Sequence, residues 1–584
     1  MRVAQEIKNQ GRTMKKIANN TIKLLLSLCI AISTLNAGEN RPVVDEEHAK
    51  KLASLVVQGF DGRLKPFDTV SMELFHKIYK GENYHGLNPN QVMLSIMVNP
   101  EYWRDAPFVK VSNKELRELL GLPSNSTHAQ FADFYGKDKN GHNYYKLKKL
   151  VEETSRKPLN TRGTFDKELL KVDERFNIFY MLFFNEIFRI VPKIDDPTHT
   201  WYSPVNAMRM FPKGEVEMVS KILENYFVSV IDAQKSGDWS KADKGLELLK
   251  EYQRKTGADV IPTENRIKFE ILFNKLQIFD NLTIIYLLAG FALLIFVFIR
   301  LLSPKVEINL LFKSVYAVNA IAFGLHTIGL GLRWYIAQHA PWSNAYESMV
   351  YIAWALGLSG MIFSRRSPIS LALTSILAGV TLFVAHLSMM DPQITNIQPV
   401  LDSYWLTIHV SVITASYGFL GLSALLGMFV LVLFIIDNQK INKEISRNIL
   451  EATRINEMSM ILGICLLTTG NFLGGVWANE SWGRYWGWDS KETWSLITIL
   501  IYAAIVHFRF VPRLNSQYWF AVASMFAYAS VLMTYFGVNF YLTGLHSYAA
   551  GDTIPIPTAI WVSAVVLSLV AFISFFKKDY SKEL

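Results

Sequence analysis

The residues best suited to chemistry lie in a tryptophan-rich segment at residues 476–496, VWANESWGRYWGWDSKETWSL. Gly483 and Gly487 interrupt any regular helix or strand within it. Apolar stretches lie on both sides, so the segment is expected to face water at a membrane surface. Its aromatic side chains are Trp477, Trp482, Tyr485, Trp486, Trp488 and Trp494.

Two interpretations of this segment differ. Tryptophan and tyrosine often settle at headgroup level in membrane proteins, which accounts for single aromatic residues at the ends of spans. It does not account for a dense cluster that also contains Asp489, Lys491 and Glu492. A flat aromatic shelf with a few charges suits a large planar apolar ligand that carries charged groups. Haem b is such a ligand.

Two histidines flank the segment in the chain. His409 lies at the start of one apolar span, shortly after the segment DSYW. His546 directly follows LTGL, just past the end of another span. Two neutral imidazoles on opposite sides of a porphyrin would bind its iron axially. At the membrane surface, the haem edge would be open to a second protein. The alternative is that each is an interfacial histidine without a ligand.

A third candidate, His507, lies in AAIVHFR near the opposite end of its span. An ionisable group there is costly unless it is paired or functional, so His507 is either a haem ligand or a hydrogen-bonded structural residue. Structural or hydrogen-bonding roles are expected for the histidines near the outer ends of other spans, His326, His339 and His386.

Two arginines are candidates for binding haem propionates, because guanidinium binds carboxylate in a bidentate way. They are Arg333, in a segment RWY, and Arg484, in the tryptophan-rich segment. Aromatic stacking is the alternative role for Arg484.

Composition restricts the class of protein. The chain has 584 residues, of which 51% are hydrophobic and only 19% are charged, which indicates a membrane protein with a soluble portion. The net charge of +9 could indicate nucleic acid, but much of the excess lies beside apolar spans and is better explained as an orientation signal, so no nucleic-acid partner is expected. The two cysteines, Cys29 and Cys465, form no Cys-x-x-Cys, which excludes intrachain dithiol exchange and a cysteine zinc site.

The first 37 residues have the pattern of a signal sequence. A basic head precedes an apolar core at residues 24–35, and the small residue Ala37 follows. The core is shorter than the roughly 20 residues of an ordinary span. Cleavage after Ala37 is expected, with retention as a signal anchor as the alternative.

Residues 38–277 show no long apolar run and are predicted to form a mainly helical exported domain. Its histidines are scattered, so surface or structural use is expected for each of them (His48, His76, His85, His128, His142 and His199). The motif GRLKPFD at residues 62–68 has no assigned chemistry. Helical periodicity predicts helices at residues 46–57, 72–79, 147–154, 167–190, 216–233 and 241–254.

Residues 278–584 predict a polytopic α-helical membrane bundle, and the fold class is mainly α. About nine spans follow the leader, each long enough to cross a bilayer. They are expected at residues 281–301, 310–332, 345–363, 369–387, 406–436, 457–476, 493–510, 518–542 and 558–576.

The loops between these spans predict the orientation. Basic residues occur in alternate loops and in the tail, which the positive-inside rule makes cytoplasmic. The loop at residues 389–404 has no Lys or Arg and is expected outside, with the tryptophan-rich segment and the exported domain. The basic residues are Arg300, Lys305, Arg365, Arg366, Lys440, Lys443, Arg447, Arg454, Arg509, Arg513, Lys577 and Lys578.

The run WGRYWGWDSKETW at residues 482–494 resembles the "WWD" signature of haem-handling membrane proteins. The chain is identified as a member of the CcsA/ResC family of System II cytochrome c synthetases, which includes fusions with CcsB (CcsBA). The resemblance covers residues 279–584 and, more loosely, the domain before them. Ser490 departs from the pattern, since proline is usual there. His409 and His546 match the two exterior histidines of the family, and His507 matches its membrane-embedded haem ligand.

The resemblance implies cytochrome c biogenesis in a bacterial inner membrane. Haem would pass outward and be joined to the Cys-x-x-Cys-His of an apocytochrome c by a thioether-forming lyase activity. It places the catalytic set on the outer face, at His409, His546, Trp482, Trp486, Trp488 and Asp489. It also implies a thioredoxin-like thiol reductant. A CcsB/ResB-type membrane protein is expected to supply the ligand opposite His507, since no CcsB-like multi-span region is found in this chain.

Two other functions stay open from the sequence. The chain could be a haem transporter or chaperone that presents haem to a separate lyase. A quinol-oxidising cytochrome b buries bis-histidine haems between spans at matched depth, whereas here the outer pair lies at span ends and His507 lies on the other side of the membrane.

Overall fold

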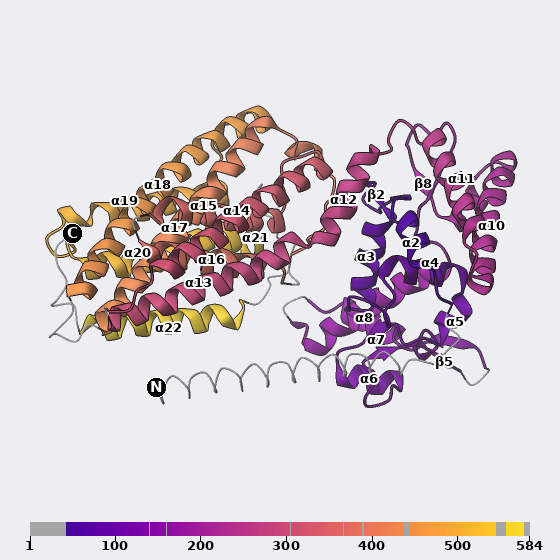
Figure 1. The fold of residues 1–584 in the computed structure, drawn as a ribbon, viewed down its shortest axis with the longest axis horizontal. Coiled ribbons are helices and arrows are strands. Elements are labelled where there is room, and N and C mark those ends of the chain that lie inside the picture. The colour runs from indigo at the N-terminus through magenta and orange to yellow at the C-terminus, as the bar shows by residue number, and fades with distance from the viewer. Residues whose placement is uncertain are drawn as a thin grey trace, which may run out of the picture.

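The computed structural model describes residues 42–138, 141–158, 161–303, 305–365, 367–387, 390–436, 443–542, 544 and 556–576. The expected leader at residues 1–37 lies outside the described residues. Figure 1 shows two parts, the domain predicted to be exported and a bundle of long helices, with α12 (Glu264–Leu276) between them. The first part is called the exported domain below, after that prediction.

The exported domain is mainly helical and has its own hydrophobic core. Large aromatic side chains such as Trp103, Phe108 and Phe179 are buried at its centre. Its helices are α2 (Glu46–Leu52), α3 (Phe67–Ile78), α4 (Pro89–Val98), α5 (Pro100–Arg104), α6 (Lys114–Leu120), α7 (Lys148–Ser155), α8 (Thr164–Phe183), α9 (Pro204–Met210), α10 (Lys213–Ser236) and α11 (Ser240–Thr256).

Among the described residues, four short antiparallel strand pairs accompany these helices. They are β1 (Val56–Gln58) with β2 (Leu64–Pro66), β3 (Val109–Lys110) with β4 (His128–Ala129), β5 (Tyr135–Lys137) with β6 (Asn143–Tyr145), and β7 (Val191–Pro192) with β8 (Trp201–Tyr202). The GRLKPFD motif forms the turn and second strand of the β1–β2 hairpin and the start of α3. Gly62 takes φ +81° in this turn, a conformation that favours glycine.

The bundle confirms the expected polytopic membrane fold. Nine of the described helical segments are long and apolar enough to cross a membrane. Their helices are α13 (Ile278–Leu302), α14 (Asn309–Ala337), α15 (Ala345–Phe363), α16 (Pro368–Ala385), α17 (Tyr404–Ile436), α18 (Lys443–Trp482), α19 (Ser490–Val506), α20 (Gln517–Leu532) and α22 (Thr558–Phe575). A π-helical turn at Met533–Gly537 continues α20 into α21 (Val538–Tyr541).

The predicted and observed elements overlap but differ in extent, and three of these differences have a clear structural reason. The helix expected at 46–57 ends at Leu52, because Val56 and Val57 pair with β2 instead. The helix expected at 167–190 ends at Phe183, since the chain turns through Asn185 at φ 56°. The span expected at 457–476 is the apolar part of a 40-residue helix, α18, whose polar turns extend beyond it at both ends.

The predicted outer loop at 476–496 is also shorter than expected. Helix α18 runs to Trp482 and α19 starts at Ser490, so only residues 483–489 connect them. Trp477 and Trp482 therefore lie on α18 and Trp494 lies on α19. The tryptophan-rich segment consists of two helix ends and a tight connection between them. This connection, residues 483–489, is called the WWD turn below.

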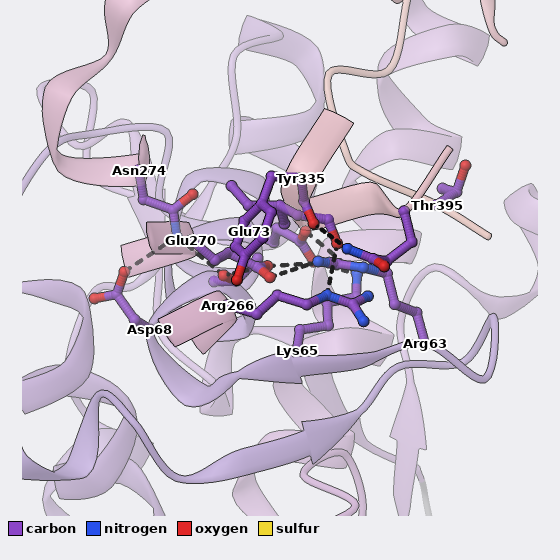
Figure 2. A network of polar contacts seen from close by, with 12 residues as sticks. Arg63, Lys65, Asp68, Glu73, Arg266, Glu270, Asn274, Tyr335 and Thr395 are labelled. Atoms are coloured by element: carbon purple, nitrogen blue, oxygen red, sulfur yellow. Dashed lines mark hydrogen bonds and ion pairs between the residues drawn. The ribbon is translucent and has the colours of Figure 1, made fainter. Parts of the chain in front are cut away.

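Helix α12 connects the exported domain to the membrane bundle. It is followed by Gln277 at φ 42° and then by α13, so the chain passes into the bundle through a single left-handed residue. Figure 2 shows the polar network around α12, in which Glu270 accepts from Arg63 and Thr69. These bonds tie the hairpin motif and the start of α3 to α12, the helix that leads into the bundle.

Candidate functional site: the WWD turn and its histidines

The WWD turn is fixed at both ends by helix caps. Gly483 adopts φ +71° and its N–H donates to the Asn479 carbonyl (2.9 Å), which ends α18 in the left-handed conformation that glycine favours. Asp489 is the N-cap of α19, and Glu492 forms the reciprocal half of a capping box. These local signals explain why two helices stop and start within seven residues.

Glu492 also organises the middle of the turn. One of its carboxylate oxygens accepts from the backbone N–H groups of Gly487 (2.8 Å) and Asp489 (3.2 Å). Asp489 itself is 9% exposed, and its side chain accepts from the Lys491 N–H (3.3 Å). The two acidic residues therefore hold the backbone, and the aromatic rings supply the exposed surface.

Two aromatic side chains of the turn project outward. Trp488 is 71% exposed and Tyr485 is 64% exposed. Trp488 has φ 56°, which is uncommon for a bulky residue and is found where surrounding structure imposes it. Trp486 packs edge-on against Trp488, with ring centroids 5.8 Å apart. The turn thus presents large apolar rings to the surroundings instead of burying them.

The other three tryptophans of the segment lie on the helices beside the turn, two on α18 and one on α19. Trp477 is buried and its ring lies 4.7 Å from that of Trp482, in an edge-on arrangement. Trp494, on α19, is partly buried. The aromatic cluster therefore has a supporting part on the helices and a presented part on the turn.

His409 lies on α17 and is held against α18. Its Nδ1–H donates to the Gly470 carbonyl oxygen (2.6 Å). A Cβ atom at Gly474 would lie only 2.6 Å from the His409 ring, so this ring fits because position 474 has no side chain. Gly470 and Gly474 form a Gly-x-x-x-Gly pair, which lets two membrane helices approach closely. The surface of α18 at Gly470 and Gly474 is called the glycine groove below. It fixes the position of the His409 ring, and the hydrogen bond to the Gly470 carbonyl fixes its tautomer.

The neighbouring glycine positions the turn on the same helix. A Cβ at Gly475 would lie 3.0 Å from the Tyr485 carbonyl oxygen, so the turn folds back onto α18 at this point. Gly474 and Gly475 are adjacent, and one faces His409 while the other faces the turn. The pair brings the predicted ligand and the aromatic turn together. Sequence reasoning missed these glycines, although Gly-x-x-x-Gly was a readable signal.

His546, the second predicted outer ligand, lies outside the described residues, but the chain leading to it is tied to the turn. A Cβ at Gly544 would lie 2.0 Å from Oδ1 of Asp489, so that backbone passes directly over this carboxylate. Lys491 Nζ donates to Asn539 Oδ1 (3.2 Å), just before this segment. A π-helical turn precedes α21 in the same part of the chain, and such turns are frequent at functional sites.

His507 lies at the opposite end of α19 from the WWD turn. It is exposed, and its Nδ1–H donates to the Ala503 carbonyl oxygen one turn earlier in the same helix (2.7 Å). The phenyl ring of Phe510 lies 5.9 Å away. His507 is therefore separated from His409 and the turn, and it faces away from the bundle.

The two arginines are placed differently. Arg333 is buried, with Nε donating to Glu347 (2.8 Å) and its terminal nitrogens donating to the carbonyls of Pro392 (2.9 Å) and Gln393 (3.0 Å). In this arrangement Arg333 holds the loop that leads to α17. Arg484 is exposed, and its guanidinium lies over Gly487, where a Cβ would be 2.6 Å from Cζ. Arg484 is thus at the turn, whereas Arg333 is built into the bundle.

The three other histidines predicted near span ends have partners within the protein. His326 is fully buried, its Nε2–H donates to the Val350 carbonyl (3.1 Å), and its ring lies 5.5 Å from that of Phe279. His339 donates to the Thr395 carbonyl (3.0 Å). His386 lies 3.0 Å from Asp280. Within the described ranges, no three His, Cys, Asp or Glu side chains gather to hold a bare metal ion.

The fold and this site define a multi-pass α-helical membrane protein with an aromatic turn beside a fixed histidine. The profile of the cytochrome C assembly protein family matches residues 342–546, which span the loop before α15, His409 and the whole WWD turn.

Curated relatives agree with this match. The chain is 33% identical to the cytochrome c biogenesis protein CcsA of Guillardia theta over 303 residues, 48% of this chain and 98% of that protein. It is 34% identical to CcsA of Prochlorococcus marinus (strain MIT 9301) over 291 residues, 44% of this chain and 92% of that protein. The chain therefore belongs to the CcsA family of cytochrome c assembly proteins, as the resemblance predicted.

One further relative extends over the exported domain. The chain is 42% identical to the protein NrfI of Wolinella succinogenes over 552 residues, which is 92% of this chain. The chain spans 60% of the length of NrfI. The similarity therefore includes both parts of the structure, and not the membrane bundle alone.

Proposed function

We propose that the chain is a cytochrome c synthetase that exports haem b and attaches it covalently to an apocytochrome c at the outer face of a bacterial inner membrane. The observation that carries this proposal is the Gly474–Gly475 pair, which packs His409 and the WWD turn against one helix. Membership of a cytochrome c assembly family supports it.

The outer site would hold haem, the substrate, between His409 and His546. The hydrogen bond from Nδ1–H of His409 to the Gly470 carbonyl keeps the proton on Nδ1 and leaves the ring's lone pair on Nε2. Nε2 is the nitrogen that would bind iron. The exposed rings of Tyr485 and Trp488 would cover the porphyrin. Arg484 would meet a propionate, because it is exposed at the turn whereas Arg333 donates to Glu347.

Attachment would be an addition reaction. Each substrate thiol of Cys-x-x-Cys-His adds across one haem vinyl group, so that a carbon–sulfur bond forms and the thiol hydrogen ends on the neighbouring vinyl carbon. The chain supplies no nucleophile, and its contribution is to place thiol and vinyl together. The histidine of the substrate then replaces one protein ligand on iron, which releases the product.

The inner end would receive haem at His507. The exposed position of this histidine suits a ligand pair completed by another protein surface, for which a CcsB/ResB-type membrane protein is the proposed partner. A thioredoxin-like reductant would keep the substrate thiols reduced. The exported domain would lie on the same side as the WWD turn.

A reconstituted assay tests this function. The chain is co-expressed with a Cys-x-x-Cys-His reporter in a host without other maturation genes, with and without a CcsB-type protein. Covalent haem on the reporter, measured by haem staining after denaturing electrophoresis, is the expected result. Haem that copurifies with the chain but never becomes covalent would contradict the synthetase proposal and favour a haem chaperone.

A further inference from the structure

A polar pocket lies where the exported domain meets the membrane bundle. It has a volume of about 340 Å³, and its lining includes Arg63 from the β1–β2 hairpin, Arg266 from α12 and Asn396 from the outer loop before α17. Gln58, Thr198 and His199 complete its polar wall. No carboxylate is among the described residues that line it, so the pocket, called the junction pocket below, has a positive lining.

The charge of Arg63 is mostly balanced inside the protein. Its terminal nitrogens donate to both carboxylate oxygens of Glu270 (3.0 and 2.5 Å), and Arg63 is 4% exposed. Its Nε is buried and has no hydrogen-bond partner among the described residues. A buried, unpaired N–H of this kind costs free energy unless something else accepts from it. This nitrogen belongs to a side chain that lines the junction pocket.

The charge of Arg266 is not balanced in this way. Its Nε donates to the Ile336 carbonyl at the end of α14 (2.8 Å), and it forms no ion pair within the part of the chain that the structure describes. The neighbouring carboxylate, Glu270, is already engaged by Arg63 and Thr69. The terminal nitrogens of a half-buried guanidinium therefore remain as donors at the pocket, which is the arrangement that binds oxyanions.

The location of the pocket restricts the ligand. Arg266 precedes the apolar helix α13 by three helical turns, and Asn396 Nδ2 donates to the Asp61 carbonyl (3.2 Å), which joins the outer loop of the bundle to the hairpin. The pocket thus lies close to the outer membrane surface. Both a dissolved phosphate and the phosphate of an anionic lipid can reach such a position.

We propose that the junction pocket binds a phosphate-type oxyanion, held by Arg266 and by Arg63, and that the bound anion connects the GRLKPFD hairpin to the outer loop of the bundle. This gives the GRLKPFD motif a role in ligand binding. The inference is independent of the haem chemistry proposed above, because the pocket shares no residue with the WWD turn or its histidines.

Binding is tested with the full chain purified in detergent. Isothermal titration with inorganic phosphate is expected to show saturable binding, which Arg266→Gln weakens roughly ten- to hundredfold, the range for loss of a charged hydrogen bond. Lys268→Gln is the matched control, since it removes one positive charge from an exposed position on the same helix and should change nothing. Asn396→Asp puts a carboxylate into the pocket and should abolish binding while Arg266 is intact.

A second arm separates the two sources of phosphate. The chain is placed in nanodiscs of phosphatidylcholine with or without phosphatidylglycerol, and retained lipid is measured by native mass spectrometry. If the wild type retains phosphatidylglycerol and Asn396→Asp does not, the ligand is a lipid headgroup. If binding is seen only with inorganic phosphate, the ligand is a dissolved anion. Either result supports the site. Binding that is equal in the wild type, Arg266→Gln and Asn396→Asp, or no binding in either arm, overturns it.

Discussion

The two ends of the membrane bundle place their candidate haem ligands in opposite ways. His409 is half-buried between two helices, and its Nδ1–H donates to a carbonyl on the neighbouring helix α18. His507 is exposed, and its Nδ1–H donates to a carbonyl of its own helix. Both rings have the same tautomer, but only the first is positioned by another element of the chain.

The difference indicates which of the two proposed sites the chain forms on its own. At the end that carries the WWD turn, glycines of α18 hold His409 and the turn together, so the geometry proposed for haem binding is already present in the chain. At the inner end, nothing in the described bundle covers His507. The outer site is therefore expected to function as a preformed pocket, whereas the inner site needs a second surface to be complete.

The largest effect is expected for His409→Ala. Holocytochrome yield should fall by more than about a hundredfold, because even changes to groups that only support a metal ligand cost about 10–100-fold. The yield of covalent haem on a Cys-x-x-Cys-His reporter measures this. His326→Ala is the control, since His326 is a buried histidine bonded to the Val350 carbonyl and removed from the turn. Equal losses in both variants would mean that only folding had been disturbed.

The next largest effect is expected for Gly474→Ala. The added methyl group would lie 2.6 Å from the His409 ring and must displace it, so haem retention should fall by about 10–100-fold. Haem per purified chain, measured as the pyridine haemochrome, reports this loss. Gly331→Ala is the matched control, because a Cβ there meets nothing within 4 Å. Normal haem content in Gly474→Ala would contradict the role of the glycine groove.

A smaller and conditional effect is expected for His507→Ala. With a CcsB-type partner present, loss of the inner ligand should lower reporter yield by roughly tenfold. Without the partner, the substitution should have little effect on haem bound at the outer site. The reporter yield is measured in four co-expressions, in which the wild type and His507→Ala are each produced with and without the partner. These four yields separate the two cases. An equal loss with and without the partner would show that the chain completes the inner site itself.

The smallest effect concerns His48, a structural histidine of the exported domain. Burial lowers the pKa of His48 below 6.5, although Asp243 opposes this shift through a hydrogen bond to Nδ1 (2.8 Å). Because the folded domain resists protonation of this ring, its stability should decrease as the pH falls below 6.5, by at most about 1.4 kcal/mol per pH unit. Lys51 and Asp45 are the other charges that face the ring, and Tyr226 bonds to its Nε2.

Thermal unfolding of the full chain between pH 7.5 and 5.5 measures this dependence. His48→Gln should be less stable at every pH but should show a weaker decrease, and its haem content should match that of the wild type. A pH dependence that is unchanged in His48→Gln would assign it to other groups.

The sequence predicted the membrane helices well because apolar length is a local property. The span expected at residues 345–363 matches α15 at both ends, where Asn344 caps the helix. It predicted α18 poorly, since hydropathy detects the apolar middle of a helix and not its polar ends. The caps on either side of the WWD turn, Gly483 and Asp489, could also be predicted from the sequence, because helix caps depend on the residues next to them in the chain.

Candidate site residues could be chosen from the sequence by their type, but the contacts that hold them could not. Asp489, a predicted catalytic residue, caps α19 and lies against Gly544. Arg333, a predicted propionate ligand, donates to Glu347, which is 14 residues away and becomes a neighbour only when α14 and α15 pack. Contacts of this kind depend on the packing of separate helices, and a single sequence does not give that packing.

We propose that His409, held on its glycine groove beside the WWD turn, is an axial ligand of haem iron at the outer face. Magnetic circular dichroism of the purified, haem-loaded chain tests this role. We expect a low-spin bis-imidazole spectrum that is lost in His409→Gly and restored by added imidazole. A bis-imidazole spectrum that is unchanged in His409→Gly would contradict it.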